Sequence, residues 1–247
     1  MRSPYSYPQR VIAHRGGGVL APENTLAGLR LAHARGFGAV EFDVMLTGDA
    51  VPILMHDDTL ERTTSGRGQV GTARAADLAR LDAGSWRDER FAGEPVPGFG
   101  AAAALCVELG LWANVEIKPW APGGVAVAER TGTLVASASA IAFSPARVLL
   151  SSFSPEALRA ARVACRLDIA CLFDALPANW REQVGAVDAV AVHCNAARLS
   201  KAEAAAIKAQ GLGLMCWTVN DPEVAQRLFD MGVDAVCTDR LDLLSPA

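Results

Sequence analysis

Short runs of aliphatic and β-branched residues alternate with alanine-rich segments of helical periodicity along most of this chain. Eight such runs are rich in Val, Ile and Leu and are bounded by Gly, Pro or Asp. We predict strands at Val11–His14, Ala39–Val44, Trp112–Lys118, Val148–Ser152, Ile169–Phe173, Ala189–His193, Leu212–Val219 and Ala235–Thr238. No other feature of the sequence constrains the fold as strongly.

The segments between these runs carry apolar residues at three- and four-residue spacing, which predicts helices. Examples are Asn24–Arg35, Pro155–Cys165 and Lys201–Gln210. Parallel strands need a crossover connection, so this alternation indicates a parallel sheet. Eight units in 247 residues match the size of an α/β fold of the closed (β/α)8 TIM-barrel type, which we predict. An open doubly wound sheet is the alternative, because periodicity does not separate the two.

One region interrupts the alternation. After Val44, a turn leads directly into Val51–His56, which predicts a hairpin or a strand extension rather than a helix. A long, polar, irregular stretch follows from Asp57 to about Pro97. We interpret residues 57–97 as a small insertion after the second strand, at the loop face where function concentrates. Without a linker or an internal repeat, residues 1–247 form one predicted domain.

Composition excludes several kinds of partner. Hydrophobic residues make up 51% of the chain and the formal net charge is −4, which argues against disorder and against binding to nucleic acid. No apolar run reaches the ~20 residues that a bilayer span needs, and the polar start lacks a secretory signal. The six cysteines form no C-x-x-C pair, so we expect buried free thiols. We therefore expect a cytoplasmic protein with no membrane insertion. A small-molecule partner is expected from the motifs below, and the oligomeric state, monomer or homodimer, stays open.

Ionisable residues gather at the ends of the early strands, where barrel enzymes carry their reactive groups. Side chains alternate along a strand, so Glu41 and Asp43 share one face, as do Glu116 and Lys118. Three carboxylates directed at one interior are costly to bury unpaired, and a cation held by all three removes that cost. Ligands that are all oxygen favour Mg²⁺ or Ca²⁺ over zinc. The alternative is a solvated edge or internal ion pairs, such as Glu116 with Lys118.

Two histidines follow predicted strands and are the candidates for acid–base chemistry. They are His14 and His56, and imidazole titrates near neutral pH. Arg15 offers a planar fork that suits phosphate oxygens. His193 also ends a strand but has no partner motif, so a place at the mouth of the site is only the less favoured alternative for it, and His33 lies within a helix and has no assigned role. A cation, an arginine and two histidines together suit a phosphodiester, because transition-state charge collects on its non-bridging oxygens.

Short motifs spaced along nearly the whole chain point to one family. They are His14-Arg15-Gly16 with Ala21-Pro22-Glu23-Asn24-Thr25, Glu41-Phe42-Asp43-Val44, Val51-Pro52-Ile53-Leu54-Met55-His56-Asp57, Thr59-Leu60-x-Arg62-Thr63-Thr64, Glu116-Ile117-Lys118-Pro119, Ser151-Ser152-Phe153, Trp217-Thr218-Val219-Asn220 and Thr238-Asp239. In this order they resemble the signature of the glycerophosphodiester phosphodiesterase family. The resemblance implies hydrolysis of glycerophosphodiesters, such as glycerophosphocholine or glycerophosphoethanolamine, to sn-glycerol 3-phosphate and an alcohol.

The resemblance also assigns the catalytic groups. It implies that His14 and His56 are the general acid and base, without deciding which is which. It implies that a divalent cation is bound by Glu41, Asp43 and Glu116. The nucleophile is either water or the glycerol hydroxyl next to the phosphate.

Five further residues are implied to bind the substrate or to support the site. Arg15 and Lys118 are expected to contact the phosphate, and Trp217 is expected to lie beside the glycerol. Glu23 and Asn24 are expected near the cation and the first histidine as supporting polar groups.

Two other functions stay open. A related phosphodiesterase that acts on lysophospholipids or phosphoinositides would need an apolar rim, and in the polar insertion the only aromatic residues are Trp86 and Phe91. A non-catalytic barrel that binds phosphorylated ligands would be marked by the loss of a histidine or of a cation-binding carboxylate, and the sequence keeps them all.

Overall fold

The protein is a closed barrel of eight parallel strands, and the computed structural model describes residues 5–246. The barrel strands are β1 (Val11–Ala13), β2 (Ala39–Leu46), β4 (Trp112–Ile117), β5 (Val148–Ser152), β6 (Asp168–Phe173), β7 (Ala191–Asn195), β8 (Gly213–Trp217) and β9 (Ala235–Thr238). They pair in the order β1-β9-β8-β7-β6-β5-β4-β2, and β1 pairs with β2 to close the ring. The predicted TIM barrel is confirmed, and the open sheet was the wrong alternative.

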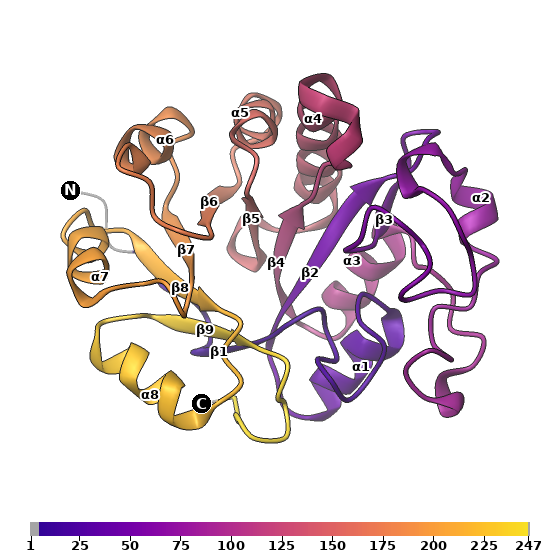
Figure 1. Cartoon of the computed structure of the whole chain (residues 1–247), viewed down its shortest axis with the longest axis horizontal. Helices are drawn as coiled ribbons and strands as arrows, with labels where there is room; N and C mark the ends of the chain where they lie inside the picture. The colour runs from indigo at the N-terminus through magenta and orange to yellow at the C-terminus, as the bar shows by residue number, and fades with distance from the viewer. Residues whose placement is uncertain (1–4, 247) are drawn as a thin grey trace.

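Helices connect consecutive barrel strands and surround them (Figure 1). They are α1 (Leu26–Ala34), α3 (Phe99–Glu108), α4 (Gly124–Ala142), α5 (Pro155–Ala164), α6 (Trp180–Ala186), α7 (Lys201–Lys208) and α8 (Pro222–Asp230). The sequence starts several of them with a cap: the side chain of Ser154 accepts from the Ala157 amide to begin α5. The main apolar core lies between helices and strands, where Phe42 of β2 meets Phe99 of α3 at 6.5 Å between ring centroids. Phe42 thus faces outward, as the predicted alternation requires.

The inside of the barrel is filled with side chains below its carboxyl end. This inner cluster consists of Tyr7, Ile12, Ala39, Trp112, Leu149, Ala170, Ala191, Met215, Ala235 and Cys237. Tyr7 precedes β1 and packs edge-on against Trp112, with 6.2 Å between ring centroids. All six cysteines are free and buried. A filled interior leaves the carboxyl ends of the strands as the place for a substrate.

The insertion after the second barrel strand is better ordered than an irregular loop. β3 (Pro52–Leu54), which runs antiparallel to β2, leads into the insertion, and the insertion itself contains α2 (Ala75–Leu78). Short 3-10 helices lie within it at Val70–Thr72 and Glu89–Phe91, and others lie at Ala121–Gly123 and Pro145–Arg147. In Figure 1 the insertion lies beside β2 and β3, at the edge of the barrel.

The insertion has an apolar core of its own, which the polar character of its sequence did not predict. Its buried residues are Met45, Ile53, Met55, Leu60, Val70, Leu78, Ala83 and Val96. Trp120, in the loop after β4, packs against this cluster, and its Nε1 donates to Oε1 of Gln69 at 3.2 Å. A Cβ on Gly71 would lie 2.3 Å from Cδ2 of Trp120, so the absence of a side chain there makes room for the indole ring. The insertion therefore contacts the loop that carries Lys118.

In the part of the chain that the structure describes, no helix combines the length and apolar character that a membrane crossing needs.

Candidate active site

The first strand-end histidine is held by a carboxylate from the last strand. Parallel pairing sets Ala13 of β1 opposite Thr238 of β9, so the residues that follow them lie side by side. His14 Nδ1 and Asp239 Oδ1 are 2.6 Å apart, and Nδ2 of Asn220 donates to the other carboxylate oxygen at 3.1 Å. Burial acts to raise the pKa of Asp239, but the hydrogen bond and charge of His14, with the hydrogen bond from Asn220 and the charge of Arg15, together lower the pKa. An ionised Asp239 thus fixes the ring through Nδ1 and leaves Nε2 directed at the pocket.

The second histidine is held in the same way by its sequence neighbour. His56 Nδ1 lies 2.6 Å from Oδ1 of Asp57. Arg62 of the insertion donates to both oxygens of Asp57, from Nε at 2.5 Å and from Nη2 at 2.9 Å. These hydrogen bonds from Arg62 lower the pKa of Asp57. Burial also lowers the pKa of His56. The two histidines therefore share one arrangement, with a carboxylate on Nδ1 and the opposite nitrogen free for chemistry.

A buried cluster of three carboxylates lines the same pocket as the two histidines. Strand register sets Asp43 of β2 directly beside Glu116 of β4, and Glu41 lies two residues before Asp43 on the same face. Ligand oxygens of the three residues lie within 4.8 Å of one another. Burial, with the charge of Asp43 added, raises the pKa of Glu116 to about 8, and it raises the pKa of Glu41 well above its usual value. The charged cluster is unfavourable by itself, and it fits a divalent cation, whose charge offsets the repulsion.

Two positively charged side chains, Lys118 and Arg15, border this cluster. Nζ of Lys118 lies 3.7 Å from Oδ1 of Asp43 and 3.8 Å from Oε1 of Glu116. Nε of Arg15 lies 3.6 Å from Oδ2 of Asp43. Burial would raise the pKa of Asp43, but Lys118 and Arg15 lower it overall. The pKa of Asp43 is thus lowered, whereas burial and the neighbouring carboxylates raise the pKa of Glu41 and of Glu116.

The loop after β1 brings Arg15, Glu23 and Asn24 to the same place. Arg15 and Asn24 both adopt left-handed backbone conformations, with φ of 50° and 55°. The Arg15 amide donates to Oε2 of Glu41 at 3.0 Å, and Nη1 donates to Oε1 of Glu23 at 2.7 Å. Asn24 donates from Nδ2 to Asp43 at 2.9 Å and accepts from the Asp43 amide at 3.0 Å. These residues therefore support the cluster directly, next to His14.

The opposite wall of the pocket is aromatic and apolar. Trp217 at the end of β8 packs edge-on against Phe153, with 5.4 Å between ring centroids. Nε1 of Trp217 and Nε of Arg15 are buried and have no hydrogen-bond partner among the described residues. Together with the two histidines and the acidic cluster, this wall encloses a pocket with an empty volume of about 510 Å³. All ten residues singled out from the sequence lie in or beside this pocket.

His193 does not line the mouth of the site, which was the less favoured alternative for it. Its side chain is fully buried in the barrel interior, where Nε2 lies 3.0 Å from the hydroxyl of Tyr7. Burial lowers the pKa of His193 to about 3, so the ring is neutral. His193 faces the barrel interior, but β7 continues past it to Asn195, so it lies below the strand end. The predicted strand Ala189–His193 ended two residues too early and therefore placed His193 at the strand end.

Sequence reasoning did not assign roles to the groups that hold the histidines. Asp57, Asp239 and Asn220 all stand within quoted motifs, as does Arg62. A carboxylate directly after a strand-end histidine was a usable signal for Asp57. Asp239 gave a weaker signal, because 225 residues separate it from His14.

Comparison with known proteins identifies the family. A model described as the Glycerophosphoryl diester phosphodiesterase family matches residues 14–243. The chain belongs to this family. Glycerophosphodiester phosphodiesterase from Caldanaerobacter subterraneus subsp. tengcongensis is 32% identical over 93% of this chain and 93% of that protein. The Bacillus subtilis protein of the same description is 29% identical over 96% of this chain and 86% of that protein.

Solved structures of phosphodiesterases agree with this placement. A phosphodiesterase from Oleispira antarctica, in complex with the product sn-glycerol-3-phosphate, has a TM-score of 0.88 and 34% identity over 93% of this chain and 92% of that one. Glycerophosphodiester phosphodiesterase from Agrobacterium tumefaciens has a TM-score of 0.76 and 26% identity over 95% of this chain and 97% of that one. As a member of the family, the chain is an enzyme, a glycerophosphodiester phosphodiesterase.

Proposed function

We propose that this enzyme hydrolyses glycerophosphodiesters, such as glycerophosphocholine and glycerophosphoethanolamine, to sn-glycerol 3-phosphate and an alcohol, with His14 and His56 as the acid–base pair. The observation that carries this proposal is the matched pair of histidine–carboxylate contacts, each 2.6 Å long, in one pocket with the acidic cluster. Two imidazoles held in this way serve a displacement at one phosphorus atom, in which one proton is removed and another is supplied.

The phosphate is bound in this proposal by Arg15 and Lys118. The buried Nε of Arg15 has no hydrogen-bond partner among the described residues, so it is available to donate to a phosphate oxygen. The Lys118 ammonium comes no closer than 3.7 Å to the carboxylates of the acidic cluster, which leaves its donors available to the same group. The unpartnered Nε1 of Trp217 is a donor for the hydroxyls of the glycerol.

Glu41, Asp43 and Glu116 would hold a divalent cation, for which we propose Mg²⁺ or Ca²⁺. Such an ion supplies charge stabilisation for the phosphate oxygens when it is bound. The protein side chains move the protons: one imidazole Nε2 accepts the proton of the attacking hydroxyl, and the other donates a proton to the alcohol oxygen as its bond to phosphorus breaks. Overall, one water is consumed and its elements appear in the phosphate monoester and in the alcohol.

A coupled assay for release of sn-glycerol 3-phosphate tests the proposal. We expect release from glycerophosphocholine and glycerophosphoethanolamine, its loss in EDTA, and its return with added Mg²⁺ or Ca²⁺. Binding of the diester without any release of product, with either ion present, would contradict the proposal and favour the non-catalytic barrel. Turnover of lysophospholipids alone would instead favour the related phosphodiesterase.

A further inference from the structure

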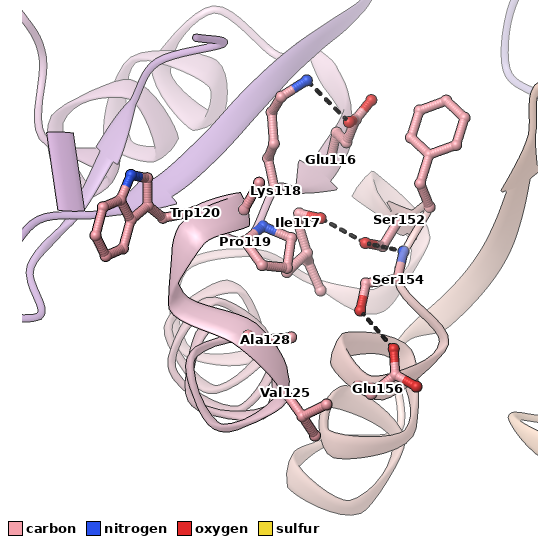
Figure 2. Close-up of a pocket in the computed structure, with 13 residues that line it drawn as sticks. Glu116, Ile117, Lys118, Pro119, Trp120, Val125, Ala128, Ser152, Ser154 and Glu156 are labelled. Carbon is pink, nitrogen blue, oxygen red and sulfur yellow. Dashed lines mark hydrogen bonds and ion pairs between the residues drawn. The ribbon is translucent and has the colours of Figure 1, made fainter. Parts of the chain in front are cut away.

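A second cavity opens beside the catalytic pocket, between the N-terminal ends of α4 and α5. We name it the α4–α5 groove. It has an empty volume of about 910 Å³ and is lined by Pro119, Val125 and Ala128 on one side and by Phe153, Ser154 and Glu156 on the other. Figure 2 shows Val125 and Ala128 on α4 facing Ser154 and Glu156 across this space. Neither catalytic histidine of the proposed reaction lines this groove, and of the three proposed cation ligands only Glu116 does.

The groove and the catalytic pocket are continuous. Glu116, Lys118 and Phe153 line both of them. Lys118 lies at the junction and is a phosphate-binding residue in the proposed function. A diester phosphate carries two organic groups, and Trp217, proposed to lie beside the glycerol, contacts Phe153 and lines the catalytic pocket but not the groove. The second organic group, the alcohol that leaves, is therefore the part of the substrate that can extend past Lys118 into the groove.

The polar groups of the groove are already engaged within the protein. Oγ of Ser152 donates to the Ile117 carbonyl at 2.6 Å, and Oγ of Ser154 donates to Glu156 at 3.1 Å. Nη2 of Arg159 donates to the other oxygen of Glu156 at 2.9 Å. Among the described lining residues, Glu156 is the only charged side chain beyond the junction with the catalytic pocket. A very polar alcohol would therefore find few groups here with which to exchange its hydrogen bonds with water.

Apolar side chains, in contrast, are exposed along the groove. Val125 is 60% exposed and Phe153 is 45% exposed. Covering such surface with hydrocarbon is favourable, because it removes apolar area from water on both sides. The distribution of charges and hydrogen bonds in the groove thus matches an aliphatic group better than a cationic or highly hydroxylated one.

Resting on the proposed function, we infer that the α4–α5 groove binds the leaving alcohol and selects glycerophosphodiesters whose alcohol carries an aliphatic chain. The sequence of the insertion offers no apolar rim for an aliphatic substrate. In this inference the apolar surface lies instead between helices α4 and α5. Each methylene of the alcohol that enters the groove should raise kcat/KM, by about twofold for partial burial in an open groove.

A series of n-alkyl esters of sn-glycerol 3-phosphate tests the inference. We would measure kcat/KM for the methyl, butyl and hexyl esters by chromatography of the products, at concentrations where all three are monomeric. The hexyl ester should exceed the methyl ester by about thirtyfold, which is roughly twofold for each of the added methylenes. Equal kcat/KM for the three esters would overturn the inference while leaving the proposed function intact. Failure of every ester, glycerophosphocholine included, would overturn both.

Two variants locate the effect in the groove. Val125→Asp places a charge on its wall, and Ala128→Phe fills part of it; both should lower the hexyl-to-methyl ratio of kcat/KM at least fivefold. Ile141→Asp is the matched control, because Ile141 lies on the same helix, is 88% exposed and is not part of the groove. It should keep the wild-type ratio. An unchanged ratio in both groove variants would overturn the inference.

A further substrate separates the two ends of the diester. The methyl ester of 1-O-hexyl-glycerol 3-phosphate carries the same chain on the glycerol, not on the leaving alcohol. We expect no comparable gain for this compound relative to the methyl ester without the chain. The inference would be overturned if the chain on the glycerol raised kcat/KM, if Val125→Asp removed that rise, and if the hexyl ester showed no rise. The groove would then bind the glycerol side of the diester.

Discussion

The guanidinium of Arg62 donates two hydrogen bonds to the carboxylate of Glu23, from Nη1 at 2.7 Å and from Nη2 at 2.8 Å, although 39 residues separate them. Glu23 also accepts from Arg15, and Arg62 also binds Asp57, the partner of His56. One arginine of the insertion thus connects a proposed phosphate-binding residue to a proposed catalytic histidine.

Replacing Arg62 should therefore impair catalysis, although Arg62 is not one of the residues proposed to contact the phosphate. We expect Arg62→Met to lower kcat by about 10–100-fold, the usual scale for residues that orient a reacting group, with a smaller change in KM. Arg62→Lys should restore only part of the rate, since an ammonium does not reproduce four directed contacts. We would compare the steady-state kinetics of Arg62→Met with those of Arg67→Met, which changes an exposed arginine in the same insertion. Equal kinetics for Arg62→Met and Arg67→Met would remove Arg62 from this role.

The two histidines should each be needed for turnover. His14→Ala and His56→Ala are each expected to depress kcat by roughly a hundredfold or more, because each removes a proton-transfer group. His33→Ala, a change at an exposed histidine of α1, should keep the wild-type rate. Near-normal kcat in both site variants would show that the chemistry lies elsewhere.

Cation binding should be visible as a change in thermal stability. A saturating divalent ion, at about 100 times its Kd, should raise the Tm of the wild-type protein by about 5–10 °C. Glu116→Gln should abolish most of this rise. The same variant should melt no lower than wild type in EDTA, because it removes a buried carboxylate whose pKa is raised by burial and by Asp43.

The control for this experiment is Glu108→Gln, which changes an exposed carboxylate near the end of α3. It should keep the full response to the ion in a thermal melt with added Mg²⁺ or Ca²⁺. An undiminished response in Glu116→Gln would mean that the ion binds at another place.

His193 should make the fold less stable in mild acid. Its pKa is about 3 in the folded protein, against about 6.5 in an unfolded chain. Between these values the unfolded state binds one more proton, so the free energy of unfolding falls as pH falls. This group alone should cost about 2 kcal/mol between pH 7 and pH 5.

Urea unfolding of His193→Gln at both pH values checks this expectation. Glutamine keeps a polar atom near the Tyr7 hydroxyl but does not titrate, so the variant should lose less stability in acid than wild type does. His33→Gln, at an exposed position, should follow the wild-type curve. The prediction fails if the two variants have the same pH dependence.

Much of the barrel was predictable because local pattern and long-range pairing agree. Strand alternation sends Glu41 and Asp43 inward and Phe42 outward, and a parallel ring then brings every strand end to one face. The proposed catalytic and cation-binding residues could therefore be named from the sequence. Their meeting in space follows from the topology rather than from any feature of the individual motifs.

Other features depended on contacts that sequence distance hides. The Asp239 contact with His14 exists only because β9 closes against β1. The insertion core could not be foreseen from residues 57–97, because Met45 and Ile53 of the flanking strands supply part of it. Val125 has the side chain of a core residue, and only its place at the end of α4 leaves it exposed.

The close contact of Trp120 with Gly71 bears on how this enzyme could be re-engineered. Lys118 lies two residues before Trp120, so the indole ring anchors the backbone that presents the ammonium to the phosphate. A chimera that takes residues 57–97 from a relative with any larger residue at the position of Gly71 would displace the ring and, with it, Lys118. The graft would then alter a phosphate-binding side chain that lies outside the exchanged residues, and keeping that single glycine is the simplest safeguard.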